Sequence, residues 1–419
     1  MSGDHGVAAG QAGASFTDLI SLGVLAASVP RDVVDTAVAA RGRGAKRAGG
    51  KLPPHVMVYF AMALALFADD DYEEVMTRLS ETLESWGSWD ESWTVATSGG
   101  ITQARARLGS EPMAEVFDTV AVPVAEELTR GAWLGAWRLM AIDGFDWDTP
   151  DTKENAAEFG YAGSGVNRSA FPKARVVTIS ECASHAVVAA AIGPMSSGEQ
   201  TLARNLYPDL EPDWLLISDR NFYGYHDWNT ARAGGAQLLW RVSASVTLPV
   251  LGAHPDGSYA SVLINPKIRG AARARLVEAA RRGDQLDPDR AVAVRVLEYT
   301  VPDRDGNGTG ELIALITTIT DPHDATAEAL AQAYHQRWEH ETGNKQLKTH
   351  LRGPGKVLRS KRPDTVRQEI YGYLLTHYAI SALICRAATE ADIDPDRVKF
   401  LRTVRIIRRQ VADPAAFSP

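Results

Sequence analysis

The pattern of apolar residues changes near Trp137, and this change constrains the fold more than any other feature of the sequence. From Phe16 to about Arg130 the apolar residues recur with the 3.6-residue period of amphipathic helices. After Trp137 they gather in short runs rich in Val, Ile and Leu and bounded by Gly, Pro, Asp or Ser, as buried strands are. The runs are RLMAID, ARVVTIS, HAVVAAAIG, WLLISD and QLLWRVSAS. The sequence therefore predicts an α/β protein with an all-α N-terminal part.

More strand-like runs lie between Thr247 and about Asp321, separated by the basic loop PKIRGAARARL, and helical periodicity returns at about Ala325. Because single cores stop growing at about 250–300 residues, a chain of 419 residues is expected to form two or three domains. The predicted parts are a disordered leader (1–15), a helical N-terminal domain (16–132), a central domain in two pieces (133–246 and 322–388), a β-rich insertion between them (247–321) and a helical C-terminal tail (389–419).

The composition is that of a globular protein in a reducing compartment. Cys182 and Cys385 are the only cysteines and neither has a partner at zinc-ligand spacing, which argues against disulfides and structural zinc. The N-terminus lacks the basic and apolar regions of a secretory signal. The longest apolar run, Val56–Ala68, is shorter than the ~20 residues that a bilayer requires. We therefore expect no membrane span and a cytoplasmic location.

Basic residues are concentrated in two segments although the formal net charge is −8. The segments Lys345–Arg367 and Arg41–Lys51 are typical of surfaces that bind a polyanion, or of solvated loops. Between them along the chain, TSGGITQARARLG reads as a glycine turn and a short helix with Arg105 and Arg107 exposed. That pattern is typical of a helix-turn-helix, and an ordinary helical hairpin stays open as the alternative.

Two of the apolar runs end in an aspartate. Asp143 closes RLMAID and Asp219 closes WLLISD, so both are predicted at the carboxyl ends of strands, where ligands collect in open α/β sheets. A carboxylate at the end of an apolar strand must be solvated, paired or bound to a metal. Two of them on neighbouring strands predict a site for Mg²⁺ or Mn²⁺, which prefer oxygen ligands.

A third carboxylate lies in the segment YHQRWEHETGNKQLK. At 100° per residue along one helix, Glu341 shares a stripe about 80° wide with an aromatic residue and three cations. These are Tyr334, Arg337, Lys345 and Lys348. The stripe offers a metal ligand flanked by groups suited to phosphate, while a solvated helix face is the alternative.

The spacing YxxRxxxExxxxxxK from Tyr334 to Lys348 resembles the signature of the DDE transposases of the insertion-sequence-four type, a bacterial cut-and-paste group. Four other stretches resemble the same family in the same order, namely ITQARARLG, AIDGFDWDTPDTKENAAEFG, FPKARVV and LLISDRNFYGYHDW. The resemblance covers most of the chain, from about Leu22 to Arg386. On these residues the chain is identified as a member of that family.

The resemblance implies a ribonuclease H-like catalytic domain, interrupted by the β-rich insertion, with Asp143, Asp219 and Glu341 as the catalytic and metal-binding triad. It implies two Mg²⁺ ions per active site, with Mn²⁺ as a substitute, which activate water at a DNA phosphodiester and stabilise the leaving oxygen. The freed 3′-hydroxyl then attacks target DNA. The expected DNA-binding residues are Tyr334, Arg337, Lys345 and Lys348, with Arg105 and Arg107 in a DNA-binding N-terminal domain.

The implied partners are double-stranded DNA, as terminal inverted repeats and as target, and a second copy of the chain, because two element ends must be brought together. The implied location is the bacterial cytoplasm, at the nucleoid. A host-adopted DNA-binding protein without catalysis, or a metal-dependent nuclease that does not join strands, stays open as the alternative. Relatives that form DNA hairpins carry a tryptophan in the insertion. None occurs here between Arg241 and Trp338, and the candidate substitutes are Tyr259, Tyr299 or another aromatic residue.

Overall fold

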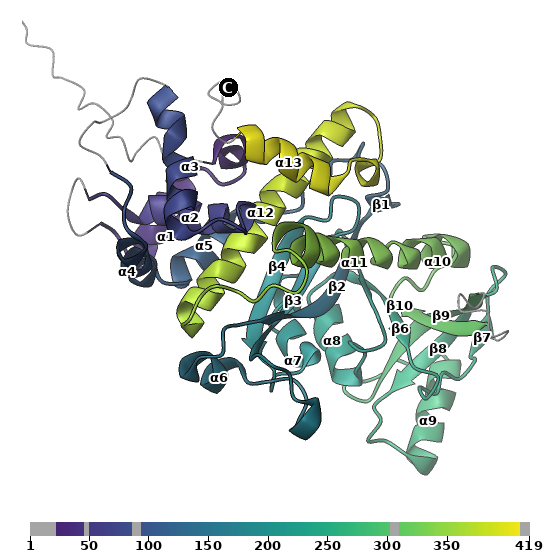
Figure 1. The fold of residues 1–419 in the computed structure, drawn as a ribbon. Helices are drawn as coiled ribbons and strands as arrows, with labels where there is room; N and C mark the ends of the chain where they lie inside the picture. The colour runs from purple at the N-terminus through teal and green to yellow at the C-terminus, as the bar shows by residue number, and fades with distance from the viewer. Residues whose placement is uncertain (1–21, 46–49, 86–93, 302–309, 411–419) are drawn as a thin grey trace, which may run out of the picture.

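The computed structural model describes residues 22–45, 50–85, 94–301 and 310–410 (Figure 1). The predicted leader at 1–15 and the end of the predicted tail, 411–419, lie outside the described residues. Within them, helices precede and follow a block of strands, as expected from the sequence. None of the described helices has the length and apolar character that a membrane span requires.

The N-terminal region is helical. It contains η2 (Gly23–Ala27), α1 (Arg31–Ala40), α2 (Pro54–Leu66), α3 (Tyr72–Ser85), α4 (Ser98–Leu108) and α5 (Glu111–Val120). α2 is apolar on all sides and is therefore buried on all sides, which places it in the core. It packs along α12 (Pro363–Glu390), where a Cβ on Gly372 would lie 2.3 Å from the Ala61 carbonyl oxygen. This close approach depends on the glycine, and it joins the N-terminal helices to a helix near the end of the chain.

One large sheet forms the centre of the molecule. Its strands are β1 (Trp133–Leu134), β2 (Trp137–Asp148), β3 (Lys173–Glu181), β4 (Val187–Pro194), β5 (Trp214–Ser218), β6 (Gln237–Val242), β7 (Gly252–Ala253), β8 (Tyr259–Ile264), β9 (Ala291–Val301) and β10 (Glu311–Thr317). The order is β4-β3-β2-β5-β6-β10-β9-β8-β7, with β1 paired to β2. Only the pairs β2–β5 and β5–β6 are parallel; the other pairs of described strands are antiparallel.

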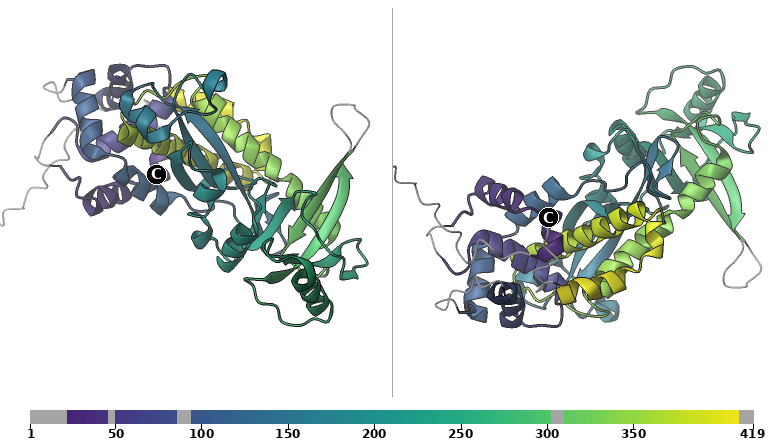
Figure 2. Two further views of the ribbon diagram at one scale, coloured as in Figure 1. Left: turned by 90° about the horizontal axis from the view of Figure 1, so that it is seen from below. Right: turned by 90° about the horizontal axis from the view of Figure 1, so that it is seen from above.

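The predicted β-rich insertion continues this sheet. β10 pairs with β6, so β7 to β10 extend the central strands toward one end of the molecule, opposite the N-terminal helices (Figure 2). The prediction of a basic loop at PKIRGAARARL is wrong, because most of this segment belongs to the helix α9 (Gly270–Arg281). Leu276 is the one buried residue of α9, so its sequence lacks the apolar stripe by which helices are predicted.

Helices cover both faces of the sheet. The remaining helices are α6 (Lys153–Phe159), η3 (Gly165–Asn167), α7 (Glu199–Ala203), η4 (Tyr207–Asp209), α8 (Tyr225–Ala233), α10 (Ala327–His335), α11 (Arg337–Lys345), the π-helical η5 (Gln346–Leu351), η6 (Pro395–Arg397) and α13 (Phe400–Gln410). On one face Ile142 of β2 packs with Leu202 of α7, and on the other Ala141 packs with Leu330 of α10. Adjacent β2 residues therefore face different helices.

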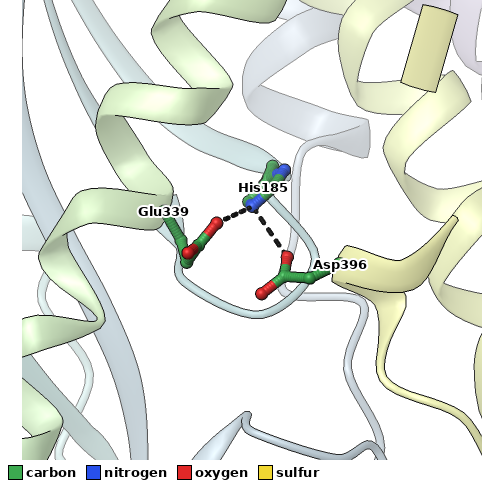
Figure 3. A group of neighbouring side chains, drawn as sticks. All are labelled: His185, Glu339 and Asp396. Carbon is green, nitrogen blue, oxygen red and sulfur yellow. Dashed lines mark hydrogen bonds and ion pairs between the residues drawn. The ribbon is translucent and has the colours of Figure 1, made fainter. Parts of the chain in front are cut away.

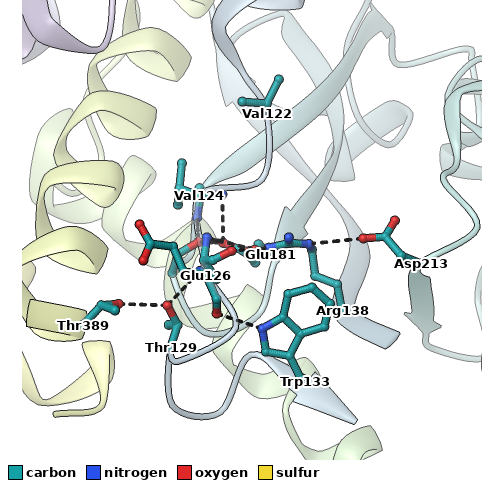
Figure 4. A network of polar contacts seen from close by, with 12 residues as sticks. Val122, Val124, Glu126, Thr129, Trp133, Arg138, Glu181, Asp213 and Thr389 are labelled. Carbon is teal, nitrogen blue, oxygen red and sulfur yellow. Dashed lines mark hydrogen bonds and ion pairs between the residues drawn. The ribbon is translucent and has the colours of Figure 1, made fainter. Parts of the chain in front are cut away.

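A buried acidic side chain fixes the segment that leads from the N-terminal helices into the sheet (Figure 4). Glu181 at the end of β3 accepts hydrogen bonds from the backbone N–H groups of Val124 and Ala125 and from the Ser184 hydroxyl. It also forms an ion pair with Arg138 of β2. A fully buried carboxylate needs such partners, since an unpaired one would be strongly destabilising. The entry to the sheet is thereby held in one position.

Candidate active site

Asp143 lies in the middle of β2 on the face covered by α10 and α11. Ala141, two residues earlier, packs on this face, and strand residues two apart share a face. Asp143 is paired with Thr178 of β3, whose hydroxyl lies 3.4 Å from the Nε2 of His340 in α11. The predicted end of the strand at Asp143 is wrong, because β2 stays paired with β3 as far as Asp148.

Asp219 follows directly on β5 and lies next to Asp143. The parallel strands β2 and β5 make their last pair at Ala141 and Ile217, and both aspartates come two residues after that pair. Asp219 therefore lies at the same level of the sheet as Asp143, and on the same face of the sheet as Ile217. The backbone N–H of Asn221 donates to Asp219 Oδ1 at 2.8 Å and orients its carboxylate. Two carboxylates from neighbouring strands therefore face the same helices.

α11 carries Glu341 over this face. Asn344, one turn after Glu341, is 6% exposed and donates from Nδ2 to Asp143 Oδ2 at 3.3 Å. Arg337 lies among the three carboxylates: its guanidinium pairs with Glu341 at 2.7 Å, lowers the pKa of Asp143 and has its own pKa raised by Asp219. The structure thus brings the predicted triad to one place.

The predicted single helix through Tyr334 and Lys348 is interrupted. α10 ends at His335, Gln336 is a turn, and α11 begins at Arg337. From Gln346 the helix has π geometry, which is most common as single turns at functional sites. Tyr334 is 3% exposed and the Arg337 side chain 12%, so neither is the open phosphate-binding group that a solvent-facing stripe predicts.

The two lysines of the predicted stripe lie in different surroundings. The Lys348 ammonium lies 5.7 Å from the centre of the Phe145 ring and lowers the pKa of Asp143, so it is close to the carboxylates. Lys345 is exposed and lines a cavity of about 410 Å³ on the side of α11 that meets the C-terminal segment. Lys348 is therefore well placed beside the candidate active site, and Lys345 is not.

The expectation that Arg105 is exposed is wrong. Its guanidinium is 2% exposed and donates to Gln368, Tyr72, Ser360 and the Thr365 carbonyl. These bonds occupy Arg105 in joining α4 to the start of α12, so it does not reach the surface where DNA would bind. Arg107, two residues later on α4, is exposed as expected.

The donors of the site fit a hard divalent cation. Burial raises the pKa of Asp143, while the Gly144 N–H, Arg337, Asn344 and Lys348 lower it, so the carboxylate is partly desolvated and gains from an added positive charge. Asp143, Asp219 and Glu341 offer oxygen ligands, with no cysteine among them. Such a set suits Mg²⁺ or Mn²⁺ better than zinc.

A second titratable cluster lies on the opposite side of α11 (Figure 3). The Nε2 of His185, in the turn between β3 and β4, lies 3.2 Å from Glu339 of α11 and 3.1 Å from Asp396 of η6. Its Nδ1 lies 2.9 Å from the Gln346 amide, which also contacts His377 at 3.1 Å. Burial lowers the pKa of His185, but the two carboxylates raise it overall to about 9.

Sequence reasoning missed these contacts for different reasons. Asn344 follows Glu341 by three residues, and helical spacing would have found it on the same face. His185 and Asp396 have no common pattern in the sequence, because they are 211 residues apart and meet only through the fold.

A mixed sheet covered by helices, with carboxylates from adjacent strands and from a covering helix, fits the class of α/β phosphoryl-transfer enzymes. Comparison with known families makes the assignment specific. The family described as Transposase DDE domain matches residues 137–378, more than half of the chain, and Insertion element 4 transposase N-terminal matches residues 19–118. The chain belongs to the DDE transposases of the insertion element 4 type.

Individual relatives agree. Transposase InsG for insertion sequence element IS4 of Escherichia coli K12 is 26% identical over 370 residues, covering 88% of this chain and 78% of InsG. Putative transposase InsZ of the same organism is 27% identical over 173 residues, covering 41% of this chain and 58% of InsZ. The piggyBac transposase synaptic complex with hairpin DNA, solved by cryo-EM, is 8% identical with a TM-score of 0.47 over 94% of this chain and 80% of that chain. A likeness at that score supports no inference.

The predicted family is confirmed, and with it the prediction of an enzyme that cleaves DNA and transfers strands. The prediction of a mixed α/β protein with a large central sheet and a helical N-terminal region is also confirmed.

Proposed function

We propose that this transposase binds the terminal inverted repeats of its insertion sequence, cleaves DNA strands by metal-dependent hydrolysis and joins the 3′ ends to target DNA by cut-and-paste transposition. The proposed catalytic and metal-binding residues are Asp143, Asp219 and Glu341. The observation that carries the proposal is the position of Arg337, which contacts Glu341 and acts electrostatically on both aspartates.

The proposed catalytic domain is ribonuclease H-like and comprises 133–246 and 322–388, with the insertion 247–321 between them. Its support is the succession of three antiparallel strands, β2 to β4, followed by the parallel strands β5 and β6. The N-terminal domain at 16–132 is the proposed site of end recognition, with Arg107 as a DNA contact. The helical tail is proposed to begin near 389.

The side chains around the triad have separate tasks in this mechanism. The Gly144 N–H and the Asn344 amide orient the Asp143 carboxylate, and Arg337 holds Glu341 toward the aspartates. Two Mg²⁺ or Mn²⁺ ions, held by the triad, would activate the attacking oxygen and stabilise the leaving oxygen of a DNA phosphodiester. Lys348 binds a phosphate next to Asp143. Tyr334 packs against Arg337, with the centre of its ring 6.0 Å from the guanidinium carbon.

The proposed partners are double-stranded DNA and a second copy of the chain on that DNA, with the bacterial nucleoid as location. Lys345 is a further proposed DNA contact, because its side chain is exposed at the surface between α11 and the C-terminal segment. The support for a DNA partner is membership of the family.

The test uses the full chain with an end-labelled inverted-repeat duplex and a target plasmid. Asp143→Asn, Asp219→Asn and Glu341→Gln are each expected to lower cleavage and joining by at least about 10³-fold, because each removes a charged ligand for the ions. Glu328→Gln, which changes an exposed carboxylate of α10, is the control and is expected to act as the parent.

Each outcome of this assay has one meaning. Loss of cleavage and joining in the three variants, with end binding and circular dichroism unchanged, supports the proposal. A parent protein that cuts without joining would identify a nuclease, and one that binds without cutting would identify a DNA-binding protein. Parent-like cleavage by one variant would remove that residue from the triad.

A further inference from the structure

Gly144 makes room for a fourth carboxylate beside Asp143. An ideal Cβ on Gly144 would lie 2.7 Å from both Cδ and Oε1 of Glu199, so any side chain at this position would displace the Glu199 carboxylate. Glu199 is the first residue of α7, which covers the face of β2 opposite to α11. Its carboxyl group therefore lies directly against the residue that follows Asp143.

Gln200 fixes the same end of α7 to the loop that follows β5. Its amide Nε2 donates to the carbonyl oxygens of Asn221 at 2.7 Å and Tyr223 at 3.3 Å. The backbone N–H of Asn221 in turn donates to Asp219 Oδ1. Glu199 is thus held between the middle of β2 and the loop that orients Asp219.

The sheet is open at this level. β2 and β5 make no pair beyond Ala141 and Ile217, so no ladder of hydrogen bonds closes the space between Asp143 and Asp219. A group that approaches from the α7 face can therefore reach the same space as groups on the α11 face.

The Glu199 carboxylate has no hydrogen bond or ion pair with any of the described residues, although Glu199 is partly buried. Arg175, the cation that acts electrostatically on Glu199, already donates to Asp146 at 3.0 Å and to the Ser197 carbonyl. Burial raises the pKa of Glu199, Arg175 lowers it, and Asp143, Asp146 and Asp219 raise it further. The Glu199 carboxylate therefore lies partly buried near three other carboxylates, with no partner of its own among the described residues.

We propose that Glu199 is a further metal-binding residue of this active site, which contributes a carboxylate oxygen to a divalent cation shared with Asp143 and Asp219. This inference rests on the proposed function, because it assumes that Asp143 and Asp219 hold such a cation. It assigns a role to Gly144, which lets α7 approach, and to Gln200, which positions α7.

The test measures Mn²⁺ binding to the full chain without DNA, by titration calorimetry and by the electron paramagnetic resonance of free Mn²⁺. Glu199→Gln keeps the size and removes the charge, and it is expected to weaken Mn²⁺ binding by about tenfold or more. Gly144→Ala is expected to weaken it similarly by displacing Glu199. Glu154→Gln is the matched control, since Glu154 is an exposed glutamate in the first turn of another short helix, and it is expected to bind as the parent does.

Asp143→Asn in the same titration separates the two proposals. Loss of binding in Asp143→Asn and in Glu199→Gln supports the inference. Loss in Asp143→Asn with parent-like binding in Glu199→Gln overturns it and leaves the triad in place. Parent-like binding in both variants overturns the metal centre itself, and this inference with it. Circular dichroism establishes that each variant is folded, and should Gly144→Ala not fold, Glu199→Gln decides alone.

Discussion

At the scale of single residues, Arg105 and Arg107 show how one side-chain type takes opposite roles within one helix. Arg105 is buried and donates to α3, α12 and the segment before α12, whereas Arg107 is exposed. A buried guanidinium is stabilising only while its donors are satisfied, and its removal leaves Gln368, Tyr72 and Ser360 with unmet hydrogen bonds. An exposed arginine costs little to remove, and its charge remains available to DNA.

Arg105→Ala is expected to lower the free energy of unfolding by about 3 kcal/mol, because it removes a buried charge from a satisfied network. Arg107→Ala is expected to change that free energy by no more than about 0.5 kcal/mol and to lower the salt dependence of DNA binding by about one phosphate contact. Urea unfolding and a salt titration of end binding measure the two effects. Equal stability losses in both variants would contradict this division.

At the scale of elements, the chain from α10 through α11 to η5 presents different groups to its two sides. Asn344 and Lys348 approach Asp143, while Glu339 and Gln346 meet His185. The interruption at Gln336 and the π turn after Lys345 alter the register that a regular helix would give. For that reason only part of the predicted stripe faces the candidate active site: Lys348 lies near Asp143, whereas Lys345 does not.

Lys348→Ala is expected to weaken binding to element ends, to lower the salt dependence by about one contact and to impair cleavage, because its ammonium lies beside Asp143. Lys356→Ala is the control. Lys356 lies beyond the turn at Gly353 and pairs with Asp69 of the N-terminal region, so its loss is expected to leave cleavage unchanged. Cleavage that responds equally to both changes would show that proximity to Asp143 does not matter.

At the scale of the whole molecule, contacts distant in sequence hold the active-site helix in place. His185 joins the β3–β4 turn to α11 through Glu339 and to the C-terminal segment through Asp396. Lys345 and Lys399 also line the cavity at this cluster, while the buried His340 and His377 lie close enough for the charge of His185 to lower their pKa. The position of Glu341 thus depends on parts of the chain from the middle and the end of the sequence.

The stability of this protein is expected to fall at alkaline pH through His185. Its pKa is raised from 6.5 to about 9 in the folded state, so its contribution is fully present below about pH 6.5 and is lost as the pH rises through about 9. At about 1.4 kcal/mol for each unit of pKa shift, the contribution is at most about 3.5 kcal/mol. Urea unfolding between pH 6 and 10, compared in the parent and His185→Gln, measures it.

His185→Gln is expected to flatten the alkaline part of the stability curve. An acid decline is expected to remain in this variant, because burial lowers the pKa of His340 and His377 to about 3 and the folded state is destabilised as the pH falls below about 6.5. An alkaline decline that is as steep in His185→Gln as in the parent would assign the effect to other groups.

Much of the fold and the core of the candidate site could be predicted from the sequence, because they depend on neighbouring residues. The runs of consecutive apolar residues in β2, β5 and α2 can be recognised in the sequence, and Asp143 and Asp219 are found because each follows such a run. The signature around Glu341 is local in the same way. Where periodicity is weak, as in α9 with its single buried Leu276, the prediction was wrong.

The burial of charged groups, and the partners that they contact, follow from the complete fold and could not be predicted from the sequence. Arg105 meets Gln368 263 residues later, and nothing near Arg105 in the chain distinguishes it from the exposed Arg107. The approach of Glu199 to Gly144 likewise depends on how α7 packs across the sheet. The physical reason is that secondary structure follows from short-range periodicity, whereas the cost of burying a charge is set by partners that only the complete fold brings within hydrogen-bonding distance.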